Sequence, residues 1–338
     1  MDTGDLDKAL QYFNLRLQLS NELYEANPQS EVLKSGLSIS YKKLGEVYQS
    51  LGNLEKALLF FNDYNQLEKE LYEANPKSEK LKTVLAISYE KLGDIYLLIG
   101  DLDKALRFFN FEHELKQELY GANPKSEKLK NGLAISYCKL GEIYLSLGNL
   151  DKALEYFNDY NRIEKELYEA NPKSEKLKNG LAISFNYLGN NYLAKGNTVK
   201  ALEFYNDYNR LEKELYEANP KSEEMKNNLA ISYEKLGVIY QSLGDLDKAL
   251  EYFYLEHELM QELYEANPKS ASLAFGLATS YIWLGWIYEK MEDNFNAKKE
   301  YSFALPIIEK LCLQTPIPQY TGQLDWLRKA IELSLIHI

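Results

Sequence analysis

A segment of 48 residues recurs along the chain, and each copy closes on a proline. The copy at residues 77–124 reads KSEKLKTVLAISYEKLGDIYLLIGDLDKALRFFNFEHELKQELYGANP. A fixed period of this size is typical of a solenoid, in which each copy packs only on its neighbours. We therefore predict an all-α fold and one elongated array, with six whole copies over residues 29–316. The closing prolines are Pro28, Pro76, Pro124, Pro172, Pro220, Pro268 and, in a degraded copy, Pro316.

Within one copy the pattern predicts two helices. Apolar residues at spacings of three and four indicate a first helix over about residues 78–99. Gly100 is expected to end it in a left-handed conformation, and Asp101 to cap the second helix. That helix should continue to about Gly121, where Asn123 and Pro124 end it and start the next one.

The two ends of the chain depart from the repeat. Residues 1–28 match only the second half of a copy, so we expect a second helix without its partner, as in a fragment of a longer array. In the last copy Glu292 replaces the turn glycine, and Pro306 is expected to kink or shorten the second helix.

After the last copy, residues 317–332 are predicted to form a capping helix, with Trp326 covering the end of the stack. The final residues 333–338, LSLIHI, resemble the translation of a sequencing adapter. We expect them to be a non-native scar, which carries no information on the fold.

Composition limits the classes of partner and the compartment. Lys and Arg number 39 against 51 Asp and Glu, and the net charge of −12 disfavours nucleic acid and anionic membranes. The two cysteines, Cys138 and Cys312, form no disulfide framework, which favours a reducing cytoplasm. No apolar run is long enough to cross a membrane.

Residues Tyr89, Leu92, Gly93, Ala105 and Phe109 have the spacing of the tetratricopeptide repeat signature, and this pattern recurs in every copy, with Tyr and Phe exchanged in some of them. The chain resembles a tetratricopeptide array whose period exceeds the usual 34 or so residues. The resemblance implies antiparallel hairpins in a right-handed superhelix and a non-catalytic role in binding a protein or peptide. This elongated variety is similar to arrays in large bacterial proteins, so the alternative is a sensor or recruitment arm of a larger signalling or hydrolase protein.

Motifs that carry chemistry are absent from the sequence: it has no phosphate loop, dinucleotide turn, nucleophile elbow or zinc helix. His113 and His257 are expected to be solvated, and Cys138 to be an ordinary thiol because no base lies beside it. Most tyrosines fall at buried repeat positions. We therefore expect no enzyme activity, no cofactor and no metal.

Two positions per copy, three residues before the repeat glycine and one after it, face the ligand in proteins that the chain resembles. They are Lys42 and Glu46, Glu90 and Asp94, Cys138 and Glu142, Asn186 and Asn190, Glu234 and Val238, and Ile282 and Trp286. From them we select the candidate partner-binding residues Lys42, Glu46, Glu90, Asp94, Glu142, Asn186, Asn190 and Glu234.

These residues predict a protein or extended peptide partner that is basic or neutral, and self-association through open array ends is a further option. Asn186 and Asn190 lie one turn apart and are suited to bonding a partner's backbone. The competing interpretation is neutral drift on an exposed face. Trp283 and Trp286 are expected to pack at the end of the stack rather than to form a pocket.

Overall fold

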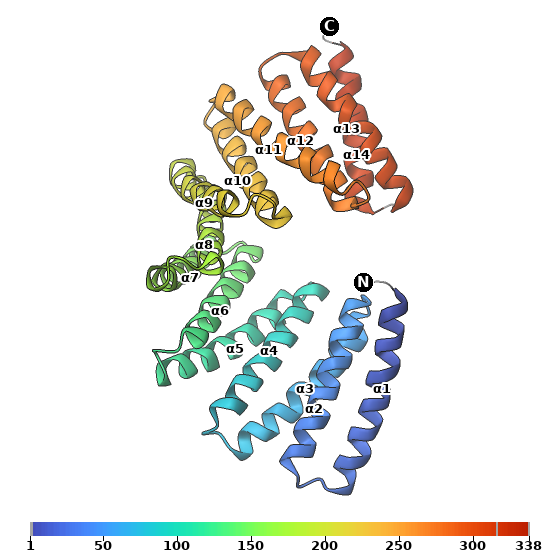
Figure 1. The fold of residues 1–338 in the computed structure, drawn as a ribbon, viewed down its shortest axis with the longest axis vertical. Helices are drawn as coiled ribbons and strands as arrows, with labels where there is room; N and C mark the ends of the chain where they lie inside the picture. The colour runs from blue at the N-terminus through green and yellow to red at the C-terminus, as the bar shows by residue number, and fades with distance from the viewer. Residues whose placement is uncertain (1–2, 316, 337–338) are drawn as a thin grey trace. The chain divides into compact units, whose positions relative to one another are not determined.

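The computed structural model describes residues 3–315 and 317–336, and throughout these residues the regular elements are α-helices (Figure 1). First and second helices alternate along the chain and pack as antiparallel hairpins, α2 on α3, α4 on α5, α8 on α9, α10 on α11 and α12 on α13. The bounds are α1 Thr3–Ala26, α2 Glu31–Ser50, α3 Leu54–Ala74, α4 Glu79–Ile99, α5 Leu102–Ala122, α6 Glu127–Ser146, α7 Leu150–Ala170, α8 Glu175–Ala194, α9 Thr198–Ala218, α10 Glu223–Ser242, α11 Leu246–Ala266, α12 Ala271–Lys290, α13 Asn294–Gln314 and α14 Pro318–Ile336.

The helices belong to two compact units. Unit 1 is Met1–Leu167 and unit 2 is Tyr168–Ile338. Unit 1 contains α1 to α6 and nearly all of α7, and unit 2 contains α8 to α14. Each unit is described by itself below.

The turn inside each hairpin follows the sequence prediction. Gly100 ends α4 with φ 86°, a conformation that glycine adopts without steric cost. Asp101 then caps α5 by accepting a hydrogen bond from the Lys104 amide at 3.1 Å. The bounds of the two helices, Glu79–Ile99 and Leu102–Ala122, agree with the predicted ones.

The connection between hairpins differs from the prediction. Asn123 ends α5, and its carbonyl accepts a hydrogen bond from the Ser126 amide at 3.1 Å, which closes a tight turn. Pro124 lies inside this turn and not in the first turn of α6. Ser126 is the cap of α6, because its hydroxyl accepts from the Leu129 amide at 3.3 Å. Proline therefore fixes the turn, and the serine two residues later begins the helix.

The signature residues pack the hairpins together. In unit 1, Ala105 and Phe109 of α5 form a buried cluster with Leu140 and Ile143 of α6. A Cβ added to Gly93 would lie 2.5 Å from Phe109 Cε1, so only glycine lets α5 approach α4 this closely. The signature residues thus pack neighbouring helices together, as the sequence predicted.

At four junctions among the described residues, a polar contact joins one hairpin to the next. A second-helix Asn or His meets a serine of the following first helix, and that serine donates its own hydroxyl to a backbone carbonyl of its helix. The pairs are Asn65 with Ser88 at 2.7 Å, and His113 with Ser136, Asn209 with Ser232 and His257 with Ser280 at 2.8 Å each.

The prediction that the two histidines are solvated is wrong. His113 is only 7% exposed and His257 is half-buried. Their Nδ1 atoms make the contacts with Ser136 and Ser280 described above. Because each serine already donates its proton elsewhere, the histidine must donate from Nδ1.

The last hairpin keeps the geometry of the others despite its altered sequence. The helix that contains Pro306, α13, has 21 residues, as α11 does, so the expected shortening is wrong. Glu292 takes the place of the turn glycine with φ 62°. The final helix, α14, packs on α13 through Leu327, which is fully buried, whereas Trp326 is 41% exposed. Pro316 and the last two residues of the predicted scar lie outside the described residues.

Candidate functional site

The two variable positions of each first helix lie on the same side of that helix, between buried residues of the scaffold. All of them are half-buried except Ile282, which is buried. We call this surface the variable face. In unit 1 it comprises Lys42, Glu46, Glu90, Asp94, Cys138 and Glu142, and in unit 2 Asn186, Asn190, Glu234, Val238, Ile282 and Trp286.

On α2 the predicted site residues form local ion pairs. Glu46 lies 2.8 Å from the Lys43 ammonium and 3.9 Å from that of Lys42. Both contacts are within one helix, at spacings of three and four residues, where such pairs contribute only a few tenths of a kcal/mol. The charges at this end of unit 1 are therefore largely balanced.

On α4 the structure brings Glu90 and Asp94 together around a lysine that the sequence analysis did not select. The ammonium of Lys139, on α6, lies 3.0 Å from Glu90 Oε1 and 2.7 Å from Asp94 Oδ1. From α5, Lys116 lies 3.7 Å from Glu90 Oε2 and pairs closely with the buried Glu112. We call these five residues the lysine cluster.

Burial and charge act against each other in the lysine cluster. Burial disfavours the ionised form of Glu90, but Lys139 and Lys116 outweigh it and hold its pKa below the usual range. Burial likewise opposes the charged form of Lys139, yet Asp94 and Glu90 raise its pKa. For Glu112, burial prevails over Lys116 and raises the pKa to about 7. A basic partner would have to compete with two lysines of the chain itself.

On α8 of unit 2, the predicted pair Asn186 and Asn190 is present. The Asn190 amide donates to Asn186 Oδ1 at 3.3 Å, and Tyr205 of α9 donates its hydroxyl to Asn190 Oδ1 at 2.8 Å. Tyr205 was missed, although it stands where most copies have phenylalanine. The extra hydroxyl fixes Asn190, so the Asn186 amide is the group of this pair best placed to donate to a partner.

On α10, Glu234 repeats the position of Glu90, and Glu256 of α11 repeats that of Glu112. The positions of Asp94, Lys116 and Lys139 are instead Val238, Met260 and Trp283. Glu256 is 3% exposed, and its Oε2 has no hydrogen-bond partner among the described residues. Burial and the nearby Glu234 raise the pKa of Glu256 well above its usual value, and burial raises that of Glu234.

Glu234 and Glu256 line a cavity of about 320 Å³ between α10, α11 and α12. We call it the carboxylate cavity. Its other lining residues are Asn227, Ile231, Met260, Ser272, Leu273, Phe275, Gly276 and Thr279.

A second cavity of unit 2, of about 370 Å³, is lined by all three tryptophans of the chain. Trp283 and Trp286 come from α12 and Trp326 from α14, with Thr279, Ile282 and Gln323 between them. We call it the tryptophan cavity; it shares Thr279 with the carboxylate cavity. Trp283 stacks on Phe253 with centroids 5.4 Å apart, while its buried Nε1 has no hydrogen-bond partner in the described part of the chain. Trp283 thus packs against the core, as expected, but the expectation that Trp283 and Trp286 form no pocket is wrong.

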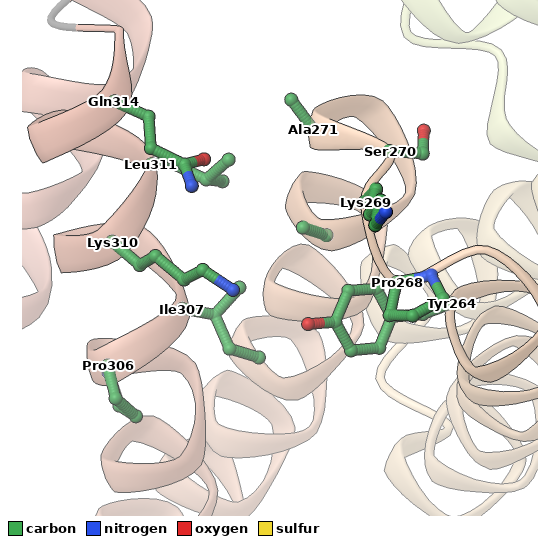
Figure 2. A pocket seen from close by; sticks show the side chains of 11 residues that line it. Tyr264, Pro268, Lys269, Ser270, Ala271, Pro306, Ile307, Lys310, Leu311 and Gln314 are labelled. Carbon is green, nitrogen blue, oxygen red and sulfur yellow. The ribbon is translucent and has the colours of Figure 1, made fainter.

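A third cavity, of about 280 Å³, marks where the repeat pattern of ion pairs stops (Figure 2). In five hairpins a first-helix lysine pairs with a second-helix glutamate, as Lys226 does with Glu262 at 2.7 Å. One period later these positions are Ala274 and Lys310. The truncated alanine leaves space, and Figure 2 shows Lys310 extending from α13 toward Tyr264 across the gap.

Across residues 3–315 and 317–336 no group of three or more His, Cys, Asp or Glu side chains is arranged to hold a metal ion. None of the helices described is both long and apolar enough to cross a membrane.

Two segments of the chain match models of the tetratricopeptide repeat, residues 84–163 and residues 230–255. The helical hairpins around both segments have the packing that this repeat requires. The chain contains tetratricopeptide repeats. It folds as an all-α tetratricopeptide-like solenoid, within which the 48-residue period fits the regular spacing of the helices.

Solved structures of tetratricopeptide-like fold resemble the chain at low sequence identity. The apo form of RapI has a TM-score of 0.63 and 14% identity, over 97% of this chain and 85% of that one. BtubC from P. vanneervenii has a TM-score of 0.59 and 20% identity, over 78% of this chain and 94% of that one. A STAND signal-transduction ATPase with a tetratricopeptide repeat sensor, from Pyrococcus horikoshii, has 0.59 and 15%, over 97% of this chain and 44% of that one. Such likeness shows the fold alone. The search of curated proteins gave no significant match.

Proposed function

We propose that the chain is a non-catalytic scaffold that binds a protein or an extended peptide on the variable face. Tetratricopeptide repeats generally mediate protein interactions. The observation that supports the proposal here is the contrast between the scaffold positions, which change little from copy to copy, and the half-buried positions between them, which change in charge and polarity. Half-buried polar side chains on a rigid helix offer hydrogen bonds at little entropic cost.

The candidate residues of the proposal are those predicted from the sequence: Lys42, Glu46, Glu90, Asp94, Glu142, Asn186, Asn190 and Glu234. Their charges favour a basic or neutral partner. Within the set we rank α8 and α10 above α4, because the carboxylates of α4 already hold Lys139 and a partner would first have to displace it.

A second candidate is a sensor or recruitment arm of a larger signalling protein. It is favoured by the likeness to the STAND ATPase, whose tetratricopeptide repeats are named as its sensor and of which this chain spans less than half. Sequencing the flanking reading frame tests it, since an adjoining nucleotide-binding or hydrolase domain is expected under this alternative only.

The binding proposal is tested by placing a photo-crosslinking amino acid at one position at a time in the full chain. Asn186 is the test position, and Glu203, exposed on the neighbouring helix α9, is the control. Covalent adducts with a protein or peptide are expected from position 186 and not from position 203. Capture should weaken as salt rises, because exposed charges are screened beyond about 8–10 Å at physiological ionic strength. Equal adducts from both positions would contradict the proposal.

A further inference from the structure

The carboxylate cavity holds two acidic side chains that lack the lysine counterions found at the equivalent positions of unit 1. Glu234 and Glu256 occupy the positions of Glu90 and Glu112, which Lys116 and Lys139 neutralise in unit 1. In unit 2 no ion pair to either carboxylate is found among the described residues, because Met260 and Trp283 replace the lysines. A buried charge without a partner is costly, so a cation that enters the cavity would stabilise the ionised form of both carboxylates.

Next to the two carboxylates, where unit 1 has its lysines, unit 2 has a space that a ligand can enter. In unit 1 the Lys139 ammonium lies 5.1 Å above the Phe109 ring. In unit 2 the Trp283 indole stacks on the equivalent Phe253, and Val238 packs against the same cluster where Asp94 would stand. Neither carboxylate has an ion pair with a lysine among the described residues, and Lys235, which follows Glu234 in the chain, only partly offsets the effect of burial on the pKa of Glu234. The cavity of about 320 Å³ beside them is far larger than the roughly 30 Å³ of one water molecule.

The buried Oε2 of Glu256 is the observation that points to a ligand. Glu256 lines the cavity and is 3% exposed, and its Oε2 has no hydrogen-bond partner in the described chain. An ammonium or guanidinium group is the chemistry that satisfies such an oxygen with a charge-assisted hydrogen bond.

The adjoining tryptophan cavity indicates what the cation is attached to. It shares Thr279 with the carboxylate cavity, so one ligand can occupy both. Three indole faces suit an aromatic or aliphatic side chain. The buried Trp283 Nε1 is a donor without an acceptor, which a peptide carbonyl would supply. A free alkylamine has neither the carbonyl nor a second side chain.

We propose that α10, α11 and α12 bind a partner's extended peptide segment by taking a Lys or Arg side chain against Glu234 and Glu256 and a neighbouring apolar or aromatic side chain into the tryptophan cavity. This inference rests on the proposed peptide-binding function and names the partner's chemistry.

The test uses the full chain and its own fluorescence, since all three tryptophans line the second cavity. The probes are arrayed capped hexapeptides that carry one Lys or Arg and one Leu or Phe at different spacings. Each has a counterpart with norleucine in place of the basic residue. Basic peptides are expected to change the fluorescence saturably and to bind at least tenfold more tightly than their norleucine counterparts. Equal binding of the two sets would overturn the proposal.

Variants locate the effect. Glu256→Gln should weaken the basic peptides at least tenfold, and so should Met260→Lys, which returns a lysine that unit 1 has. Glu212→Gln is the matched control, because Glu212 is also buried but does not line the carboxylate cavity; its affinity should stay within twofold of the wild type. Circular dichroism checks that each variant is folded. A loss in the control as large as that of Glu256→Gln contradicts the proposal.

Two further outcomes separate the possible errors. If n-butylamine alone binds as tightly as the best peptide, the site takes a free amine and the peptide assignment is wrong. If no peptide binds while position 186 still crosslinks a protein, this inference fails and the proposed function stands. If position 186 gives no adducts while the basic peptides bind as expected, the proposed binding on the whole variable face is wrong, and binding at α10, α11 and α12 remains.

Discussion

The lysine cluster of unit 1 and the carboxylate cavity of unit 2 are built on the same two glutamates of equivalent hairpins. Around Glu90 and Glu112, two lysines of the chain supply the positive charge. Around Glu234 and Glu256, the lysine positions carry Met260 and Trp283. An acidic residue at a variable position therefore does not by itself indicate a basic partner. What decides is whether a neighbouring hairpin already contributes the cation.

Removing the central lysine should make unit 1 resemble unit 2. Lys139→Met leaves Glu90 and Asp94 without their closest cation, and we expect it to lower the free energy of unfolding by about 3 kcal/mol at pH 7. Urea denaturation measures the loss. The loss should shrink as the pH falls from about 4.5, the ordinary pKa of a glutamate in the unfolded chain, through the lowered pKa of Glu90 in the folded chain. The control Lys125→Met, at an exposed turn residue, should change little. A loss that is the same at pH 4 and pH 7 would show that packing rather than charge is responsible.

The scaffold, unlike the charges, should respond equally in both units. A Cβ at Gly93 would lie 2.5 Å from Phe109, and one at Gly237 would lie 2.6 Å from Phe253. Gly93→Ala and Gly237→Ala are each expected to cost about 2 kcal/mol through overpacking. The control Gly132→Ala meets nothing within 4 Å inside α6 and should stabilise slightly. Thermal unfolding checks all three, and clearly unequal losses for the first two would break the equivalence.

Neutralising the buried glutamates should help unit 2 more than unit 1. The pKa of Glu256 is raised, so the folded chain holds that proton more tightly than the unfolded chain does. The associated stability is lost as pH rises above about 4.5. Glu256→Gln is therefore expected to stabilise by roughly 1–2 kcal/mol at pH 8, and Glu112→Gln by less, because Lys116 and Lys139 already offset the charge of Glu112. Urea midpoints at pH 8 and pH 4 decide this, and a larger gain from Glu112→Gln would contradict it.

The smallest effect at pH 7 is expected at the contact between His113 and Ser136. Burial lowers the pKa of His113 to about 4, so its contribution is present above about pH 6.5 and is lost as pH falls toward 4. Between pH 7 and pH 5 this amounts to roughly 1–2 kcal/mol. His113→Asn reproduces the contact that Asn209 makes with Ser232. It should change the free energy of unfolding by under about 0.5 kcal/mol at pH 7 and should remove the part of the acid sensitivity that His113 causes. Matched unfolding at pH 7 and pH 5 tests it; an unaltered pH dependence would speak against it.

Much of the fold could be predicted because its determinants are local. Gly100 and Asp101 adjoin the turn that they form, and the spacing of Tyr89 and Leu92 is set by the helix itself. The cap at Ser126 was missed because proline draws attention to the turn, whereas the hydroxyl that begins α6 lies two residues on. Pro306 does not shorten α13, because packing of α13 against α12 and α14 outweighs the lost hydrogen bond.

The candidate site was less predictable, because its charges are decided between helices. Glu90 and Asp94 lie one turn apart on α4, as their spacing indicates, but Lys139 meets them from about one period further along the chain. Sequence alone held one usable signal, since the second helices are of two kinds: Tyr64 and Asn65 in one, Glu112 and His113 in the other. Comparing copies of the same kind would have shown that Met260 stands in for Lys116.

The Asn or His to Ser contact has a consequence for how such an array changes in length. Each serine oxygen accepts from either an asparagine amide or a histidine Nδ1 at nearly the same distance, so the junction does not depend on which kind of hairpin precedes it. Inserting or deleting 48 residues in frame would join two compatible surfaces. Recombination between copies can thus alter the number and order of binding positions while leaving every junction chemically intact.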